Sequence, residues 1–234
     1  MRAGETNGSI PLLHLGRFDA GEAKRAAFLA DLRAAAHDVG FFYRDGELAA
    51  FSRLQSSRLG ADSRPAGLAR ADRHRRRTAG ASAGGARDAD AQGVGAHKDS
   101  ELITLLQDDQ GGLQVETPQG WIDVPPRPGT FVINIGELLE LASDGYLRAT
   151  MHRVLTPPAG VERLSAVFFL GARLDATVPV LPLPPALASH ARGPERDPHN
   201  PLFREVGLNY LKGRLRSHPD VARRHHADLL DPPT

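Results

Sequence analysis

Three side chains in this sequence have the types and spacing of metal ligands. His97 and Asp99 are two positions apart, so on an extended strand both side chains leave the same face. His152 lies further along the chain in a second strand-like segment. Two imidazoles and one carboxylate form the triad that suits non-haem Fe(II) and leaves coordination positions open. We therefore predict an iron site at these three residues, with no catalytic residue beyond it.

A His-x-Asp pair alone is weak support for a site, because the chain has ten histidines. Six others lie in polar or proline-rich surroundings, where surface positions are the rule. These are His74, His190, His199, His218, His225 and His226.

A second pair could bind a carboxylate. Arg163 and Ser165 share one face of an apolar strand-like run, ahead of Val167 and Phe169. A guanidinium grips both oxygens of a carboxylate in a fork, and a neighbouring hydroxyl adds a donor. Taken alone, the pattern is better explained by an ordinary surface ion pair of an arginine at a strand end.

Composition limits the class of protein. A length of 234 residues allows one domain with a sizeable core, and a net charge of +1 gives no reason to expect a polyanionic partner. The absence of cysteine excludes disulfides, zinc ribbons and thiolate nucleophiles. No run approaches the roughly 18 apolar residues of a membrane span. We expect a soluble, cytoplasmic protein that binds neither nucleic acid nor membrane.

Residues 1–59 form a first region that combines strands and helices. Phe28, Leu32, Ala35 and Val39 recur at helical spacing, and Gly40 follows as a C′ glycine would. The expected elements are an edge strand at 9–15, a helix over 20–39, a strand at 41–43 and a second helix over 47–59.

Residues 60–93 differ in kind, since they are rich in Ala, Arg, Gly and Asp and nearly lack large apolar side chains. Such a segment buries too little surface to offset its ordering entropy, so we predict an irregular segment. Its basic run at 73–77 could be interpreted as a nucleic-acid patch. A solvated loop is the simpler interpretation.

Residues 94–175 are rich in short strands with close turns, which favours a double-sheet jelly roll. Residues 176–234 begin with a proline-rich segment and end in two expected helices that Pro219 divides. The predicted fold class is mainly β with flanking helices. The expected strands lie at 102–106, 113–116, 121–124, 130–135, 150–155 and 164–170.

The order of these motifs is more specific than any one of them. His97-x-Asp99, then His152, then Arg163-x-Ser165 resembles the Fe(II)- and 2-oxoglutarate-dependent oxygenases, in the isopenicillin N synthase-like branch. The resemblance covers roughly residues 9–55 and 90–230. Further motifs that carry it are Leu105-Leu106-Gln107-Asp108-Asp109, Gly111-Gly112-Leu113-Gln114-Val115, Trp121-Ile122-Asp123-Val124-Pro125-Pro126 and Asn134-Ile135-Gly136-Glu137.

The resemblance implies a double-stranded β-helix of cupin-like type, monomeric, with a small-molecule substrate. His97, Asp99 and His152 would hold Fe(II), and Arg163 and Ser165 would meet the far carboxylate of 2-oxoglutarate. With O2, the enzyme would oxidise a substrate C–H bond by hydroxylation, desaturation or ring closure, releasing succinate and CO2. An isopenicillin N synthase-like oxidase that uses no 2-oxoglutarate is the alternative, because there the same Arg-x-Ser pair meets a substrate carboxylate.

The sequence departs from this branch between the N-terminal region and the metal-binding strand. Members carry several helices and a strand there, where this chain has residues 60–93, so it resembles an internally truncated member. We hypothesise that the segment is partly an out-of-frame product. A GC-rich codon string for the branch's Asp-Trp-Arg-Glu-Gln-Ile-Asp-Ile, read in a shifted frame, gives Leu68 to Arg75. A catalytically impaired remnant is therefore a further alternative, and the nucleotide sequence tests the frameshift.

Overall fold

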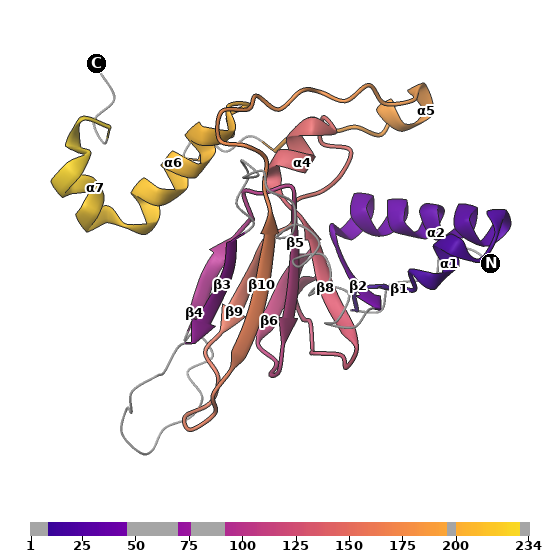
Figure 1. The fold of residues 1–234 in the computed structure, drawn as a ribbon, viewed down its shortest axis with the longest axis horizontal. Coiled ribbons are helices and arrows are strands. Elements are labelled where there is room, and N and C mark those ends of the chain that lie inside the picture. Colours follow the sequence, from indigo (N-terminus) through magenta and orange to yellow (C-terminus); the bar gives the residue numbers. More distant parts are fainter. Residues whose placement is uncertain (1–8, 46–69, 76–91, 196–199, 230–234) are drawn as a thin grey trace, which may run out of the picture.

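Two β-sheets enclose the interior of the protein (Figure 1). The structure, a computed structural model, describes residues 9–45, 70–75, 92–195 and 200–229. The larger sheet has the order β1 (Leu12–Leu13), β2 (Phe41–Asp45), β8 (Thr130–Ile135), β5 (Ile103–Asp108), β10 (Leu164–Leu170) and β3 (Arg70–Arg75). The smaller sheet has the order β4 (Gln92–His97), β9 (His152–Leu155), β6 (Leu113–Thr117) and β7 (Gly120–Asp123).

Alternate side chains of β2 face opposite sides of the larger sheet. Phe41 and Tyr43 are buried in the cluster that joins the two sheets, together with Leu113 and Val115 of β6. Phe42 points the other way and packs against the N-terminal helices. The strand is therefore buried on both faces, which explains its uninterrupted aromatic run.

The N-terminal helices cover the outer face of the larger sheet (Figure 1). They are α1 (Gly16–Asp19), α2 (Glu22–Ala34) and a π-helical turn, η1 (Ala35–Val39). Phe28 of α2 packs in the cluster with Phe42, Phe131 and Ile133. Gly40 ends the turn with φ of 72°, and its N–H donates to the Ala35 carbonyl. The predicted C′ glycine is confirmed.

The remaining helices lie beyond the end of the strands where β8 finishes (Figure 1). Buried Leu138 and Leu141 of α4 form a third apolar cluster with Val178 and Val206. Figure 1 shows α6 and α7 extending away from the sheets. The bounds are α4 (Glu137–Ala142), α5 (Pro185–Ala188), α6 (Val206–Ser217), α7 (Pro219–His225) and η2 (Ala227–Leu229).

The mainly β class with flanking helices is confirmed, as are the strands predicted downstream of residue 94. The prediction of an irregular segment over 60–93 does not hold at Arg70–Arg75, where β3 pairs antiparallel with β10. Backbone hydrogen bonding to an open sheet edge depends little on side-chain type, so composition did not reveal this strand. The rest of that segment up to residue 91, and the helix expected over 47–59, lie outside the described residues. Within the described part, no helix is both long and apolar enough to cross a membrane.

Replacing Gly40 by alanine should lower the free energy of unfolding by about 2–4 kcal/mol. The left-handed conformation is strained for any residue with a Cβ, and this Cβ would lie 2.1 Å from the Arg148 carbonyl oxygen. Urea unfolding measures the change. Gly111→Ala is the matched control, because nothing lies within 4 Å of its added Cβ. Equal stability of the two variants would contradict the expectation.

Candidate metal centre

Strand register brings the two predicted histidine ligands together. His97, the last residue of β4, is the cross-strand partner of His152, the first residue of β9. Asp99 follows two residues beyond β4, and its Oδ1 lies 3.4 Å from His97 Nε2 and 3.5 Å from His152 Nε2. One donor atom from each residue can be chosen so that all three lie within 4.8 Å of one another. Residues far apart in sequence therefore form one cluster, as predicted.

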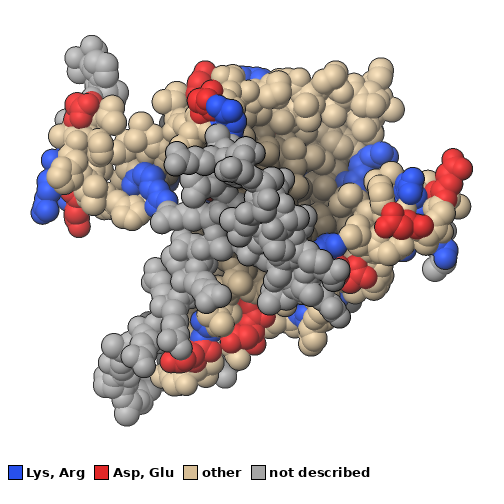
Figure 2. Space-filling model, in the orientation of Figure 1, with Lys and Arg blue, Asp and Glu red and all other residues tan. Residues whose placement is uncertain are grey.

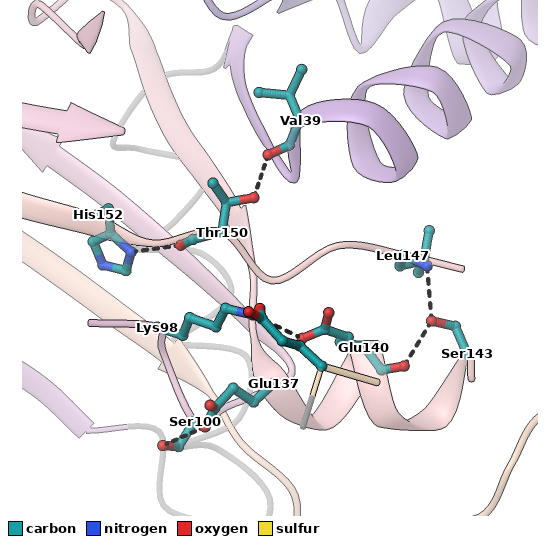
Figure 3. A network of polar contacts seen from close by, with 10 residues as sticks. Val39, Lys98, Ser100, Glu137, Glu140, Ser143, Leu147, Thr150 and His152 are labelled. Atoms are coloured by element: carbon teal, nitrogen blue, oxygen red, sulfur yellow. Dashed lines mark hydrogen bonds and ion pairs between the residues drawn. The ribbon is translucent and has the colours of Figure 1, made fainter. Parts of the chain in front are cut away.

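Backbone carbonyls determine which nitrogen of each histidine is available to bind a metal. His97 Nδ1 lies 2.8 Å from the Gly95 carbonyl oxygen, and His152 Nδ1 lies 3.2 Å from that of Thr150 (Figure 3). A carbonyl only accepts, so each Nδ1 must carry a proton, and Nε2 is the nitrogen of each ring that faces Asp99 and can bind a metal once it is deprotonated. The Thr150 hydroxyl donates in turn to the Val39 carbonyl at 2.6 Å, which ties this strand end to the π-helical turn.

Two residues that the sequence analysis missed hold the other oxygen of Asp99. The Thr104 hydroxyl donates to Asp99 Oδ2 at 2.5 Å, and Asn134 Nδ2 donates to the same oxygen at 2.8 Å. Thr104 on β5 and Asn134 on β8 are cross-strand partners in the larger sheet, and both are buried. The signal that could have found them is a single polar residue in an apolar strand, as in Ile133-Asn134-Ile135, since buried polar groups need partners.

The same contacts set the charges of the cluster. Burial alone would raise the pKa of Asp99, but hydrogen bonds from His152, His97 and Asn134 hold the pKa of its carboxyl well below 3.8. Burial would lower the pKa of His97, but its hydrogen bond and attraction to Asp99 outweigh this and raise the pKa above 6.5. Asp99 is therefore an anion throughout the neutral range, as a metal ligand must be.

Lys98, between the two ligands, points away from them toward α4 (Figure 3). Its Nζ lies 3.5 Å from Glu140 Oε2 and forms a second ion pair with Glu195. The alternation of an extended backbone sends Lys98 to the opposite side from His97 and Asp99. Its positive charge therefore does not compete with a cation for the cluster.

The donor set fits a divalent transition metal. Two donors, each about 2.1 Å from a metal and about 90–110° apart, are separated by about 3.0–3.4 Å. Both imidazole-to-carboxylate separations are close to that range. Two neutral imidazoles and one carboxylate on one side suit Fe(II) with open positions. Among the described residues, His97, Asp99 and His152 form the one group of histidine and acidic side chains with such geometry.

All three ligands line a cavity of about 330 Å³, and so do Arg163 and Ser165. Much of the remaining lining is apolar, with Phe41 on one strand and Val167 and Phe169 along β10. The structure thus brings all five predicted site residues to one cavity. A cavity that combines apolar walls with a few convergent polar groups is typical of a small-molecule site.

Arg163 already has an internal carboxylate partner. Its Nη2 donates to Asp108 Oδ2 at 2.5 Å, and its Nε donates to the Gly111 carbonyl at 3.1 Å. Both side chains of the pair are largely buried, and burial raises the pKa of Asp108 although Arg163 opposes this. Arg163 is therefore held in one orientation rather than free at a strand end.

Comparison with known proteins points to one superfamily. Residues 81–172 match the 2OG-Fe(II) oxygenase superfamily. A 2-oxoglutarate-dependent dioxygenase of Dothideomycetidae sp. (strain 11243) is 38% identical over 152 residues, 58% of this chain and 41% of that protein. The 1-aminocyclopropane-1-carboxylate oxidase of Dictyostelium mucoroides is 42% identical over 144 residues, 59% of this chain and 39% of that protein. The chain thus spans about two fifths of the length of these curated relatives.

Solved structures share the fold. A full-length Neurospora crassa protein, crystallised in complex with alpha-KG and 5-formyluracil, superimposes with a TM-score of 0.60 at 17% identity, covering 93% of this chain and 99% of that one. The rice dioxygenase for auxin oxidation superimposes with a TM-score of 0.57 at 22% identity, covering 89% of this chain and 96% of that one. The predicted double-stranded β-helix is confirmed by these likenesses, which concern the fold alone.

Metal affinity should fall in acid because His97 must lose its proton to become a ligand. Its pKa lies above 6.5, so the apparent Kd for Co2+ should rise up to about tenfold per pH unit as pH drops through that pKa. Above the pKa the affinity should level off, while Asp99 stays ionised throughout.

Calorimetric titration with Co2+ between about pH 8 and about pH 5.5 measures this dependence. His14→Ala is a matched control, since His14 pairs with Asp45 away from the cavity. An affinity that stays constant across the range would contradict the expectation.

Proposed function

From the premise that its residues 81–172 belong to the 2OG-Fe(II) oxygenase superfamily, we propose that this chain is a non-haem Fe(II)- and 2-oxoglutarate-dependent dioxygenase. It oxidises a C–H bond of a small molecule and releases succinate and CO2. The observation that carries the proposal is the convergence of His97, Asp99 and His152 on a cavity that also holds Arg163 and Ser165. One part of that cavity suits a cation, and another suits a carboxylate.

The ligand residues have one task, which is to hold Fe(II) in a fixed geometry. His97 and His152 would bind through Nε2, because their Nδ1 atoms face carbonyls. Asp99 would bind through Oδ1, because its Oδ2 is held by Thr104 and Asn134. Bound Fe(II), with 2-oxoglutarate and O2, supplies the oxidising chemistry. The chain's own contribution is position and the exclusion of water by apolar walls.

Arg163 and Ser165 would bind the distal carboxylate of 2-oxoglutarate. Arg163 commits its Nε and one N–H of Nη2 to Gly111 and Asp108, which leaves its other N–H groups for a ligand. Ser165 is buried on β10, which begins one residue after Arg163, and lines the same cavity. A guanidinium held in place by Asp108 loses less entropy on binding a carboxylate than a free one.

The finer assignments rest on the sequence. The motif order resembles that of the isopenicillin N synthase-like branch, and we propose that the chain is a member of it and a monomeric, cytoplasmic enzyme that binds neither nucleic acid nor membrane. On the face in Figure 2, basic and acidic side chains of the described residues are intermingled. The cavity favours no one outcome among hydroxylation, desaturation and ring closure.

Two alternatives keep the metal but change the reaction. An oxidase that uses no 2-oxoglutarate would direct Arg163 and Ser165 to a substrate carboxylate. An impaired remnant would bind metal without turnover, and the atypical composition of residues 60–93 motivates this alternative. Oxygen consumption measured with and without 2-oxoglutarate separates the oxidase from the dioxygenase.

Purified protein given Fe(II), O2 and 2-oxoglutarate should release succinate even without a second substrate. Asp99→Ala should reduce the rate of succinate release at least about 100-fold, because it removes one of the three ligands. Mass spectrometry of succinate measures the rate. Asp123→Asn is the matched control, because this exposed carboxylate bonds Gln114 away from the cavity. Metal binding without succinate release would favour the remnant.

Arg163→Lys should raise the KM for 2-oxoglutarate by about 10–100-fold with a smaller change in kcat, because an ammonium keeps the charge beside Asp108 but loses the fork. Retaining the charge avoids an unpaired buried carboxylate, which would destabilise the fold. Ser165→Ala should raise the same KM by a smaller factor. An unchanged KM in both variants would show that the carboxylate binds elsewhere.

A further inference from the structure

The two oxygens of Asp99 have different surroundings. Oδ1 faces the Nε2 atoms of both histidines, whereas Oδ2 accepts two hydrogen bonds from the larger sheet. Exposure is 7% for Asp99, 2% for Thr104 and 3% for Asn134, so solvent hardly reaches these contacts. In such a dry site hydrogen bonds to a carboxylate are strong and costly to break.

We propose that Thr104 and Asn134 are positioning residues that restrict Asp99 to binding the metal through a single oxygen. This inference rests on the proposed function, and it assigns a role to residues that neither ligate the metal nor belong to the Arg-Ser pair. A carboxylate on a metal can bind through one or both oxygens. Here both donors occupy Oδ2, so chelation through both oxygens would require breaking two buried hydrogen bonds.

The consequence concerns the coordination positions that remain free. Three protein donors on an octahedral ion leave three positions, which a bidentate keto acid and O2 would fill. A chelating Asp99 would take a fourth position and leave no room for one of these. Thr104 and Asn134 would thereby keep one coordination position of the metal open without contacting the metal themselves.

The arrangement is rigid because its members come from regular structure. Thr104 and Asn134 are cross-strand partners, and their neighbours Leu105 and Ile133 are paired next to them in the same ladder. The backbone of Asp99 is fixed as well, since its carbonyl accepts from the Glu137 N–H at 2.7 Å. Asp99 cannot rotate its carboxylate without breaking its hydrogen bonds to Thr104 of β5 and Asn134 of β8.

The test uses Co2+ in the full chain and two near-isosteric variants, Thr104→Val and Asn134→Leu. Difference infrared spectroscopy on metal binding, with carboxyl-labelled aspartate, measures the splitting between the antisymmetric and symmetric stretches. The splitting is wide for binding through one oxygen and narrow for chelation. We expect a wide splitting in wild type, a narrow one in both variants, and a Kd for Co2+ that rises about 10–100-fold.

Two matched variants separate this role from a general effect on folding. Thr104→Ser keeps the hydroxyl and should restore the wide splitting. Thr130→Val removes a threonine hydroxyl from the same sheet, and this hydroxyl donates to the Arg127 carbonyl away from the cavity. The variant should therefore show the splitting and the Kd of the wild type. Urea unfolding identifies any variant that does not fold. If one of Thr104→Val and Asn134→Leu is unfolded, the splitting measured in the other tests the positioning role.

The outcomes distinguish the two proposals. A wide splitting in folded Thr104→Val and Asn134→Leu, at any affinity, would overturn the positioning role. Wild-type protein that binds Co2+ but releases no succinate with Fe(II) and 2-oxoglutarate would overturn the dioxygenase assignment alone, because the infrared comparison needs no turnover. Wild-type protein that does not bind Co2+ would overturn both.

Discussion

The structure depends on one carboxylate that two sheets share. Asp99 faces a cross-strand histidine pair of the smaller sheet with one oxygen and a cross-strand Thr104–Asn134 pair of the larger sheet with the other. A buried carboxylate is costly unless its lone pairs are satisfied, and here four groups from two layers satisfy them. The same contacts that make the charge tolerable also set the distance between the sheets at this point.

The rest of the fold supports that junction. The apolar cluster of Phe41, Tyr43, Leu113 and Val115 joins the two sheets through inward-facing side chains. Phe41 also lies against the ring of His152, with centroids 5.2 Å apart, so the core extends to the metal-binding side chains. Close backbone approach also fixes the segment beside Asp99, because a Cβ at Gly136 would lie 2.0 Å from the Glu101 carbonyl oxygen. Packing therefore contributes to the positions of the three triad side chains.

Lys98, between two of the triad residues in the chain, and Arg163, in the cavity wall, are both paired with acidic side chains. Asp108 opposes Arg163, and Glu140 with Glu195 opposes Lys98, so neither basic side chain faces the triad unpaired. Under the proposed function this pairing matters, because a free ammonium beside the triad would repel a metal ion. The internal partner of Arg163 also explains how a guanidinium is kept ordered in a largely apolar wall.

The sequence by itself predicted the β-rich class, the downstream strands and the Gly40 helix end, and it singled out the five candidate site residues, because alternation, turn residues and motif order can be seen in the chain itself. Only the tertiary structure decided that His97 and His152 are cross-strand partners, that Thr104 and Asn134 bind Asp99, and that Arg163 is paired with Asp108. The His97–His152, Asn134–Asp99 and Arg163–Asp108 contacts join segments distant in sequence, which no local pattern specifies. Thr104 is only five residues from Asp99, and its contact depends on how the chain turns between them. The strand at Arg70–Arg75 was missed for a related reason, since pairing at a sheet edge depends on the neighbouring backbone more than on the strand's own composition.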